Sequence, residues 1–264
     1  MSETFLEKVT AKTREKVSRV KTDQYLAALR KKADKVRQDA VPHLFKQAIS
    51  RSDRNNIIAE IKRASPSKGA LNLNLDVAMQ AKRYEKGRAA AISVLTEPDH
   101  FEGSIGDLLN VRKNVKIPVL RKDFIVDEFQ IFEAAAAGAD AILLIVAALS
   151  ADDLRRLRSI AEEELGLDAL VEVHDEAELT LAGNSGASII GVNNRNLHSL
   201  AVSLDVSREL AGLKPSGSLL VAESGLTSRS EIDELKAAGF DGFLIGETLM
   251  RSEDPVGKLE ELGA

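Results

Sequence analysis

The chain of 264 residues contains no cysteine and no tryptophan, only two tyrosines and six prolines, and aromatic residues make up 4% of it. Without cysteine there is no thiol nucleophile, no disulfide and no thiolate site for zinc. The longest apolar run extends from Ala141 to Leu149, far short of the roughly 20 residues that a membrane-spanning helix needs. The first ten residues also lack the apolar core of a signal peptide. We therefore expect a cytoplasmic location.

The composition is otherwise that of an ordinary globular protein. Hydrophobic residues make up 44% of the chain and charged residues 29%, which excludes a disordered, collagen-like or disulfide-scaffold protein. Barrels and large α/β folds often use about 250 residues for a single domain. The length therefore permits one domain with a large core.

Charge is distributed unevenly along the chain. Residues 1–50 carry twelve Lys and Arg against six Asp and Glu, a balance of +6, which leaves 24 against 35, or −11, for the rest. A basic segment can bind nucleic acid. Here, however, its apolar residues recur at helical spacing, which predicts two amphipathic helices with solvated charged faces. These apolar residues are Leu6, Val9, Val17 and Val20, and then Tyr25, Leu29 and Val36. We therefore expect no nucleic acid and no membrane as partners.

Eight short apolar runs follow, each succeeded by a polar or glycine-containing turn and a segment of helical period. They are 57–61, 90–95, 118–120, 141–146, 169–173, 188–192, 219–222 and 242–245. Continuous apolar strands indicate a parallel sheet that is buried on both faces, and eight equivalent βα units favour closure into a barrel. Gly87, Gly138, Gly186 and Gly239 each precede a strand, and we expect each to take the left-handed turn that ends a helix.

We thus predict an α/β fold, an eight-stranded parallel (β/α)8 TIM barrel. Residues 1–264 would form one domain, with a helical N-terminal extension over 1–50 and the barrel over 57–264. Active sites of such barrels lie at the C-terminal ends of the strands.

Those strand ends are unusually polar. If Ile58 and Leu120 point into the barrel, the alternation of side chains along a strand brings several charges to one mouth. Lysines among glutamates suit a site that binds an anion, donates one proton and accepts another. Each residue alone could instead cap a helix or reach solvent. The polar strand-end residues are Glu60, Lys62, Lys122, Glu172, Asn193, Arg195 and Glu223.

Glycines after the last two strands indicate a phosphate site. Backbone N–H groups at Gly225 and at Gly246, Glu247 and Thr248 would form the cradle that barrels commonly build there, beside Ser224. The alternative is that these glycines only turn the chain. The loop 65–69, Ser-Pro-Ser-Lys-Gly, follows the first strand and has hydroxyl and ammonium donors for the same anion.

Nine blocks in this chain resemble the indole-3-glycerol phosphate synthase family, and the match is collinear from about residue 57 to 257. The blocks are IAEIKRASPSKG at 58–69, SVLTE at 93–97, FEGS at 101–104, LRKDF at 120–124, LLIV at 143–146, VEVH at 171–174, GVNNRNL at 191–197, ESGL at 223–226 and IGETLM at 245–250. The family also has a helical N-terminal extension. The match resembles the monofunctional form rather than forms that are fused to an isomerase domain.

The resemblance implies a carboxy-lyase of tryptophan biosynthesis. Its reaction converts 1-(2-carboxyphenylamino)-1-deoxyribulose 5-phosphate to indole-3-glycerol phosphate, carbon dioxide and water, with no cofactor and no metal. It also implies that Lys122 is the general acid of ring closure and that Glu172 handles a proton in dehydration.

The remaining family roles are carried over in the same way. Lys62 would pair with anionic groups of the substrate and share in proton transfer, while Glu60, Asn193 and Glu223 orient substrate and lysines. Ser65 and Arg195 would bind the anthranilate carboxylate, and Ser224, Gly225, Gly246 and Glu247 would lie at the phosphate. The aromatic ring would lie among Phe101, Phe124, Leu143 and Leu197. The family often has serine at the position of Glu247. A carboxylate there would lie beside the phosphate dianion, so we expect only the backbone N–H of Glu247 to face the phosphate.

Two other functions stay open on the residues alone. An isomerase of the same pathway would be expected to use a cysteine base, which is absent here. A non-catalytic phosphate-binding barrel would be expected to have lost one of Lys62, Lys122 and Glu172. The four histidines, at 43, 100, 174 and 198, are scattered, and we expect all of them to be surface or loop residues and not metal ligands.

Overall fold

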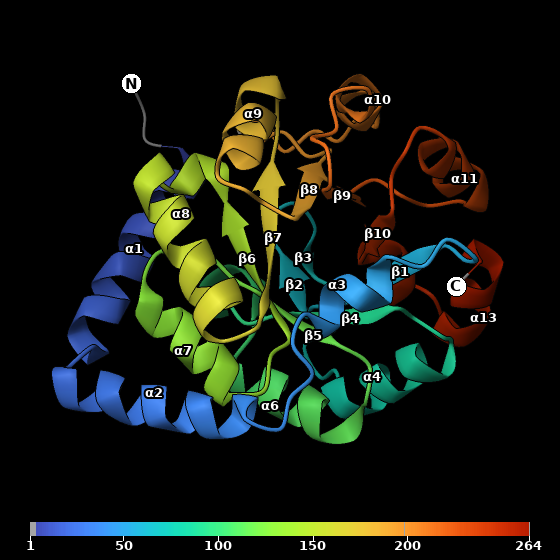
Figure 1. Cartoon of the computed structure of the whole chain (residues 1–264). Helices are drawn as coiled ribbons and strands as arrows, with labels where there is room; N and C mark the ends of the chain where they lie inside the picture. The colour runs from blue at the N-terminus through green and yellow to red at the C-terminus, as the bar shows by residue number, and fades with distance from the viewer. Residues whose placement is uncertain (1–3, 198, 264) are drawn as a thin grey trace.

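Eight parallel strands form a closed barrel in the computed structural model, which describes residues 4–197 and 199–263 (Figure 1). Around the barrel they follow the order β1-β10-β9-β8-β7-β6-β5-β4, and β4 pairs with β1 to close it. The strands are β1 (Asn56–Ile61), β4 (Ala91–Leu95), β5 (Val119–Lys122), β6 (Ala141–Ile145), β7 (Asp168–Val173), β8 (Ile189–Asn193), β9 (Leu219–Glu223) and β10 (Gly242–Ile245). The predicted (β/α)8 barrel is confirmed, because each of the eight apolar runs is one of its strands.

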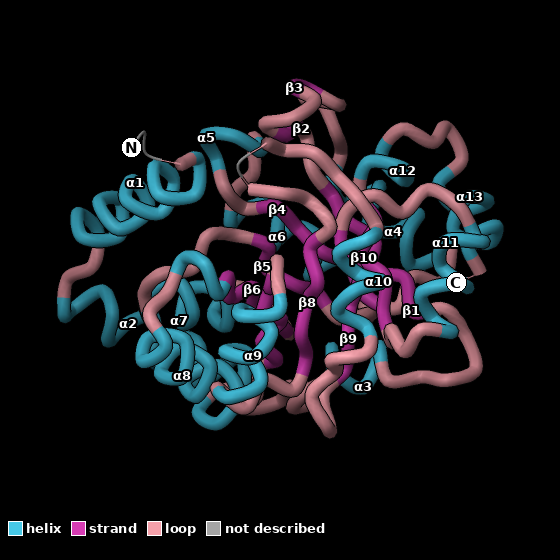
Figure 2. The backbone as a smooth tube through the Cα atoms, turned by 90° about the horizontal axis from the view of Figure 1, so that it is seen from above, coloured by secondary structure: helices cyan, strands magenta, loops and turns pink. Residues whose placement is uncertain are grey.

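Helices surround the strands on the outside, as the view from above shows (Figure 2). Those after β1 are α4 (Val77–Lys86), α5 (Pro98–Phe101), α6 (Ile105–Asn114), α7 (Glu128–Ala136), α8 (Ala151–Ser159), α9 (Glu176–Asn184), α10 (Asp205–Ala211), α11 (Arg229–Ala237), α12 (Glu247–Met250) and α13 (Pro255–Leu262). A 3-10 turn, η1 (Val146–Ala148), follows β6, and a π turn, η2 (Ile160–Glu164), continues α8. The loop after β1 contains a small hairpin of β2 (Ala64–Ser65) and β3 (Gly69–Ala70).

Side-chain alternation divides the strands into an inner and an outer layer. Ile58 and Leu120 belong to the cluster that fills the barrel, as predicted, together with Leu170 and Val221. Their neighbours, such as Ile57 and Val119, pack outward against the helices. Because residues two apart share a face, the inner layer continues at the strand ends into polar side chains.

Short polar side chains begin most of the outer helices. Asp76, Ser104, Asp127, Ser150 and Asp175 each cap the N-terminus of the helix that follows, by accepting a hydrogen bond from a backbone N–H of the first turn. Such a cap typically contributes about 1 kcal/mol. The start of each of these helices is therefore encoded locally, by a capping residue in the segment that leads from strand to helix.

Glycine ends the helices as predicted at three of the four positions. Gly138, Gly186 and Gly239 have φ of 84°, 82° and 108°, in the left-handed region. The prediction for Gly87 is wrong: its φ is −74°, and Arg88 takes the left-handed conformation instead. A Cβ at residue 87 would lie 2.7 Å from Leu259 Cδ1, so the missing side chain lets α13 pack closely.

The N-terminal segment forms three helices, α1 (Phe5–Val20), α2 (Asp23–Arg37) and α3 (Leu44–Ile49), one more than the two predicted. In Figure 1, α2 runs below the barrel beside α7, and α1 rises at the left toward the C-terminal ends of the strands. Phe45 and Ile49 of α3 are fully buried in the inner cluster and close the lower end of the barrel. Its six residues are too few to show a helical period.

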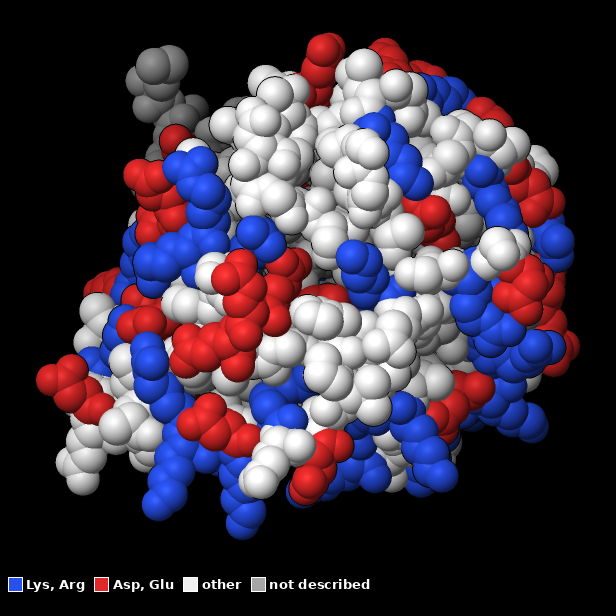
Figure 3. All heavy atoms as spheres, in the orientation of Figure 1, with Lys and Arg blue, Asp and Glu red and all other residues white. Residues whose placement is uncertain are grey.

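Many charges of this segment pair with the barrel. Lys21 contacts Asp127 at 2.8 Å and Glu128 at 3.3 Å, and Arg30 contacts Glu128 at 3.0 Å. In Figure 3, basic side chains along the lower edge alternate with acidic ones and form no continuous patch there. The charges therefore belong to solvated and paired helix faces.

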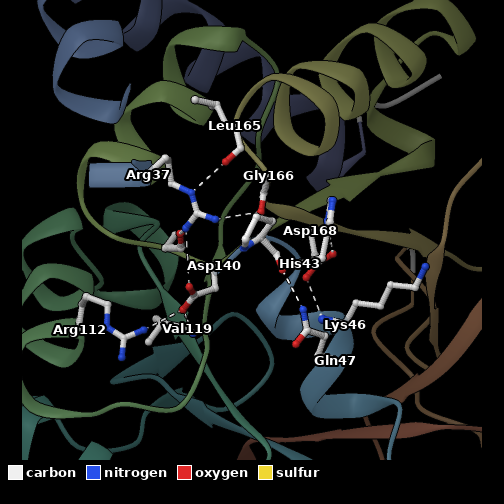
Figure 4. A network of polar contacts seen from close by, with 12 residues as sticks. Arg37, His43, Lys46, Gln47, Arg112, Val119, Asp140, Leu165, Gly166 and Asp168 are labelled. Carbon is white, nitrogen blue, oxygen red and sulfur yellow. Dashed lines mark hydrogen bonds and ion pairs between the residues drawn. The ribbon is translucent and has the colours of Figure 1, made fainter. Parts of the chain in front are cut away.

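A buried polar network fixes the end of α2 to the lower rim (Figure 4). Arg37 donates to the carbonyl oxygens of Leu165 and Gly166, both at 2.9 Å, and lies 3.7 Å from Asp140. Asp168 accepts from the backbone N–H of Lys46 at 2.8 Å.

None of the described helices is long and apolar enough to cross a bilayer.

Candidate active site

A cavity of about 950 Å³ opens at the C-terminal ends of the strands. All the residues that sequence reasoning assigned to the site line it. They are Glu60, Lys62, Ser65, Phe101, Lys122, Phe124, Leu143, Glu172, Asn193, Arg195, Leu197, Glu223, Ser224, Gly225, Gly246 and Glu247. The barrel thus brings together residues that lie up to 187 positions apart, from Glu60 to Glu247.

Lys122, the last residue of β5, lies between two carboxylates. Its Nζ is 2.9 Å from Glu172 Oε2 and also forms an ion pair with Glu223. The lysine side chain is 12% exposed, and the two carboxylates are buried. Burial would lower the pKa of Lys122, but Glu172, Glu223 and Glu60 outweigh it and raise the pKa above its ordinary value. The ammonium form is therefore held in the resting site.

The two carboxylates respond to the same lysine in opposite ways. Burial raises the pKa of both, but Lys122, His174 and Asn193 reverse this at Glu172 and lower its pKa. At Glu223 burial outweighs Lys122, and together with the repulsion by Glu172 it raises the pKa to about 7. Separation of two neighbouring carboxyl pKa values in this way leaves one group ionised as a base while its neighbour titrates near neutrality.

A second ion pair stands at the end of β1. Lys62 Nζ is 2.5 Å from Glu60 Oε1, and both side chains point into the cavity. Asn193, at the end of β8, donates to Glu172 Oε1 at 3.1 Å. The cavity floor therefore holds two lysines and three glutamates.

Two glycines make room for this cluster. A Cβ on Gly191 of β8 would collide with Glu223 Oε1, and a Cβ on Gly246 would collide with Glu60 Oε1 and lie 2.9 Å from Lys62 Nζ. Gly246, predicted only as part of a phosphate cradle, thus also accommodates the first ion pair. Sequence reasoning missed the role of Gly191. A glycine inside a strand can leave space for a side chain of the neighbouring strand, and that side chain is identified only from the structure.

The rim above β9 and β10 has the features of an anion site. Ser224 and Gly225 are consecutive left-handed residues, with φ of 67° and 85°. Such a conformation at a non-glycine residue often marks a functional turn. Glu247, the first residue of α12, directs its carboxylate to Arg251 Nε at 3.0 Å and to Lys68 Nζ at 3.5 Å.

Apolar side chains form the opposite wall. Phe101 and Phe124 lie with their ring centroids 6.5 Å apart. Phe5 of α1 lies 6.3 Å from the Phe124 ring and also lines the cavity, as does Leu6. Sequence reasoning did not assign Phe5 to the site, since no motif links α1 to the strand ends. Arg195, near this wall, donates to the carbonyl oxygen of Leu200 at 3.0 Å.

His174 lies in the loop between β7 and α9, as predicted, but that loop turns it toward the site. Its side chain is only 13% exposed, and Nε2 lies 3.4 Å from Glu172 Oε1. His43 and His100 are at the surface, with side chains 45% and 32% exposed. His198 lies outside the described residues. The VEVH motif contained the signal, because a residue two positions after Glu172 shares its side of the chain. In 4–197 and 199–263, no three His, Cys, Asp or Glu side chains gather as metal ligands.

Comparison with known proteins identifies the family. The family model described as indole-3-glycerol phosphate synthase matches residues 6–262. Proteins of that name are 46% identical in Carboxydothermus hydrogenoformans, over 98% of this chain and 99% of that protein, and 46% identical in Exiguobacterium sibiricum, over 97% and 95%. The protein of that name from Koribacter versatilis is 49% identical over 89% of this chain and 91% of its own length.

A solved structure supports the fold alone. Thiamine phosphate pyrophosphorylase from Pyrococcus furiosus superimposes with a TM-score of 0.60 at 18% identity, over 79% of this chain and 93% of that one. The sequence relationship is far closer and spans almost the whole chain, so the chain belongs to the indole-3-glycerol phosphate synthase family, the lyases of tryptophan biosynthesis.

Proposed function

We propose that this chain converts 1-(2-carboxyphenylamino)-1-deoxyribulose 5-phosphate to indole-3-glycerol phosphate, and that Lys122, Glu172 and Lys62 carry the proton transfers. The observation that carries the proposal is the buried arrangement of Lys122 between Glu172 and Glu223. A lysine held cationic in a water-poor pocket suits a carbonyl oxygen that gains negative charge during ring closure.

Ring closure joins an aromatic carbon of the substrate to its carbonyl carbon. Lys122 donates a proton to the carbonyl oxygen as the charge develops there. Carbon dioxide then leaves from the same aromatic carbon and restores the benzene ring. Lys62, paired with Glu60, is placed beside the phosphate rim, where it holds substrate anions and supports the proton transfers.

Dehydration needs an acid and a base. The hydroxyl group leaves as water after it gains a second proton, while the neighbouring methylene loses one. Glu172 suits the base, because its lowered pKa keeps it ionised beside Lys122. Asn193 donates to Glu172 and Glu223 holds Lys122, so both act as positioning residues.

The remaining cavity residues divide by the parts of the substrate. Backbone groups of Ser224, Gly225, Gly246 and Glu247 hold the phosphate, while the Glu247 carboxylate pairs with Arg251 and Lys68. Arg195 and Ser65 bind the carboxylate. The aromatic ring packs among Phe101, Phe124, Leu143 and Leu197, with Phe5 as a further contact.

The wider setting belongs to the same proposal. The chain acts in the cytoplasm on this phosphorylated sugar derivative as one domain, a barrel over 57–264 with its extension over 1–50. We propose no role for nucleic acid, membrane, metal or organic cofactor.

Growth of indole fluorescence after mixing with the substrate tests the proposal. The chain has no tryptophan, so the protein background comes only from Tyr25 and Tyr84. Folded enzyme should produce the signal, and dialysis against a chelator should leave the rate unchanged. A folded protein that gives no indole from fresh substrate would refute the synthase activity, and a strict metal requirement would indicate a different barrel chemistry.

A further inference from the structure

The proposed reaction, on which this inference rests, consumes one proton from outside in every turnover. The carbonyl oxygen leaves as water and therefore needs two protons. One of them balances the proton lost by the substrate methylene. The carboxylate leaves as neutral carbon dioxide, so its charge disappears and the second proton has to come from solvent. The buried cluster therefore needs a route by which Lys122 regains its proton.

The contacts of Glu172 with two basic side chains provide the first step of such a route. Its Oε2 faces Lys122 Nζ at 2.9 Å, and its Oε1 faces His174 Nε2 at 3.4 Å. One carboxylate thus bridges the catalytic lysine and an imidazole. Proton transfer between Glu172 and Lys122 needs no movement of either main chain.

His174 is held in place on its far side. Its Nδ1 lies 3.1 Å from Glu178 Oε2, and the same oxygen accepts from the backbone N–H of His174 at 2.8 Å. Glu178 belongs to the first turn of α9, which begins directly after β7. The ring is therefore oriented between two carboxylates, one inside the site and one outside.

A second cavity, of about 640 Å³, lies on the outer side of this pair. Both His174 and Glu178 line it, together with polar side chains such as Asn196 and Ser203, whereas Lys122 and Glu172 line only the first cavity. His174 thus stands in the wall between the second cavity, which polar side chains line in part, and the catalytic cluster.

We propose that His174 acts as a positioning residue. It relays a proton from the second cavity to Glu172, and through Glu172 to Lys122. In the relay, His174 gives its Nε2 proton to Glu172, Glu172 gives one to the neutral Lys122 amine, and His174 regains a proton from water in the second cavity. No oxidant, reductant or co-reactant is needed.

Charges around the ring favour its protonated form. Burial would lower the pKa of His174, but Glu172 and Glu178 outweigh burial and raise it to about 10. The other titratable groups around the second cavity are Asp175 next to His174, Arg195 after β8 and Glu7 of α1. Below about pH 10 the ring therefore holds a proton for transfer. Above that pH the ring loses this proton and the relay stops.

Comparison of the first turnover with later ones tests the relay. Lys122 is already protonated at rest, so His174→Gln should form its first equivalent of indole at nearly the rate of the unaltered enzyme. Later turnovers should be about 10- to 100-fold slower with little change in KM, which gives a burst followed by a slow phase. Imidazole added to His174→Ala should restore the slow phase in a saturable way.

Two further measurements sharpen the result. His43→Gln, at the opposite end of the barrel, is the matched control and should keep both phases. The unaltered enzyme should itself develop a burst as the pH rises above about 10, a test that does not depend on whether a variant folds.

The relay is wrong if His174→Gln slows the first turnover as much as the later ones, because that indicates a structural role. It is also wrong if the variant shows no burst and keeps the unaltered steady rate. In both cases indole formation by the unaltered enzyme still supports the proposed function, whereas its absence would overturn the function itself.

Discussion

The chemistry at the residue scale depends on how closely Lys122 is enclosed. Glu172 and Glu223 share this one ammonium group, and their pKa values move in opposite directions from the ordinary carboxyl value. Glu223 could not approach in this way without free space on the neighbouring strand. Gly191 supplies that space for Glu223, so a residue without a side chain is as important to the cluster as the charged ones.

Gly191→Ala should therefore disturb catalysis more than folding. The added methyl group displaces Glu223 and with it Lys122, and a shift of about 1 Å at such a group can lower kcat roughly 100-fold. Steady-state kinetics with a thermal melt checks this, with Gly212→Ala as the control, since nothing lies within 4 Å of a Cβ there. Unchanged kcat in Gly191→Ala would show that Glu223 does not position the lysine.

Single-turnover experiments should distinguish the roles of Lys122 and Glu172. Lys122→Ala should lower kcat by roughly 10²- to 10⁴-fold, as loss of a general acid does, and should slow carbon dioxide release. Glu172→Gln should release carbon dioxide before indole fluorescence appears, because dehydration comes later. If both variants lose both signals in parallel, the two residues act as one coupled unit and the separate roles are wrong.

At the scale of elements, the barrel strands were predictable from the sequence and several connections were not. Strands buried on both faces have continuous apolar sequences, so all eight were found, and the alternation through Ile58 to Glu60 placed the charges correctly. Three strands extend further than predicted at their C-terminal ends, so that Lys122, Asn193 and Glu223 are their last residues. Helix α3 and the conformation of Gly87 depend on distant contacts, which local patterns do not contain, whereas His174 contacts Glu172 and Glu178, both close to it in sequence.

The loop with β2 and β3 meets α12 through one exposed ion pair. Lys68 Nζ lies 3.5 Å from Glu247 Oε1, with side chains 47% and 34% exposed. Burial raises the pKa of Glu247, but Arg251 and Lys68 outweigh it and lower the pKa, so the group is anionic at neutral pH. A carboxylate at this rim competes with an incoming phosphate for the lysine.

Glu247→Gln should therefore strengthen phosphate binding, and Lys68→Gln should weaken it. An exposed pair of this kind contributes at most about 1 kcal/mol, so KM and the inhibition constant of inorganic phosphate should change up to roughly 5-fold in opposite directions. Inhibition assays at low and high salt measure the effect, which salt should screen. Glu234→Gln, remote from the cavity, serves as control, and equal shifts in all three variants would exclude the competition.

The N-terminal segment contacts both ends of the barrel. Phe45 of α3 is buried in the cluster that fills the barrel, whereas Phe5 of α1 lines the cavity at the C-terminal ends of the strands. The buried network around Arg37 and Asp140 fixes the middle of this segment to the lower rim (Figure 4). The buried contacts of Arg37 and the residues of the catalytic cavity therefore lie at opposite ends of the barrel.

Arg37→Ala should lower stability without lowering kcat at 25 °C. Its side chain is 8% exposed, and its loss removes the hydrogen bonds to the carbonyl oxygens of Leu165 and Gly166 and one of the two cationic neighbours of buried Asp140. Breaking such a buried ionic contact costs about 3 kcal/mol, or roughly 6–12 °C in Tm for a chain of this size. Arg19→Ala is the matched control, because the Arg19 side chain is 71% exposed and pairs with Glu15 at the surface, so its loss should cost less than about 1 kcal/mol.

The pH dependence of the Arg37→Ala defect gives a second check. Burial raises the pKa of Asp140 in spite of its hydrogen bond from Val119 and the charges of Arg112 and Arg37. A carboxyl group with a raised folded pKa contributes stability below its unfolded pKa and loses that contribution as the pH rises through the folded value. Without Arg37 the ionised form is harder to bury, so the deficit relative to the unaltered protein should be largest at neutral pH. It should shrink as acid protonates Asp140. Thermal melts across this range would contradict the assignment if the deficit were constant, because only the pH-independent bonds to Leu165 and Gly166 would then be at work.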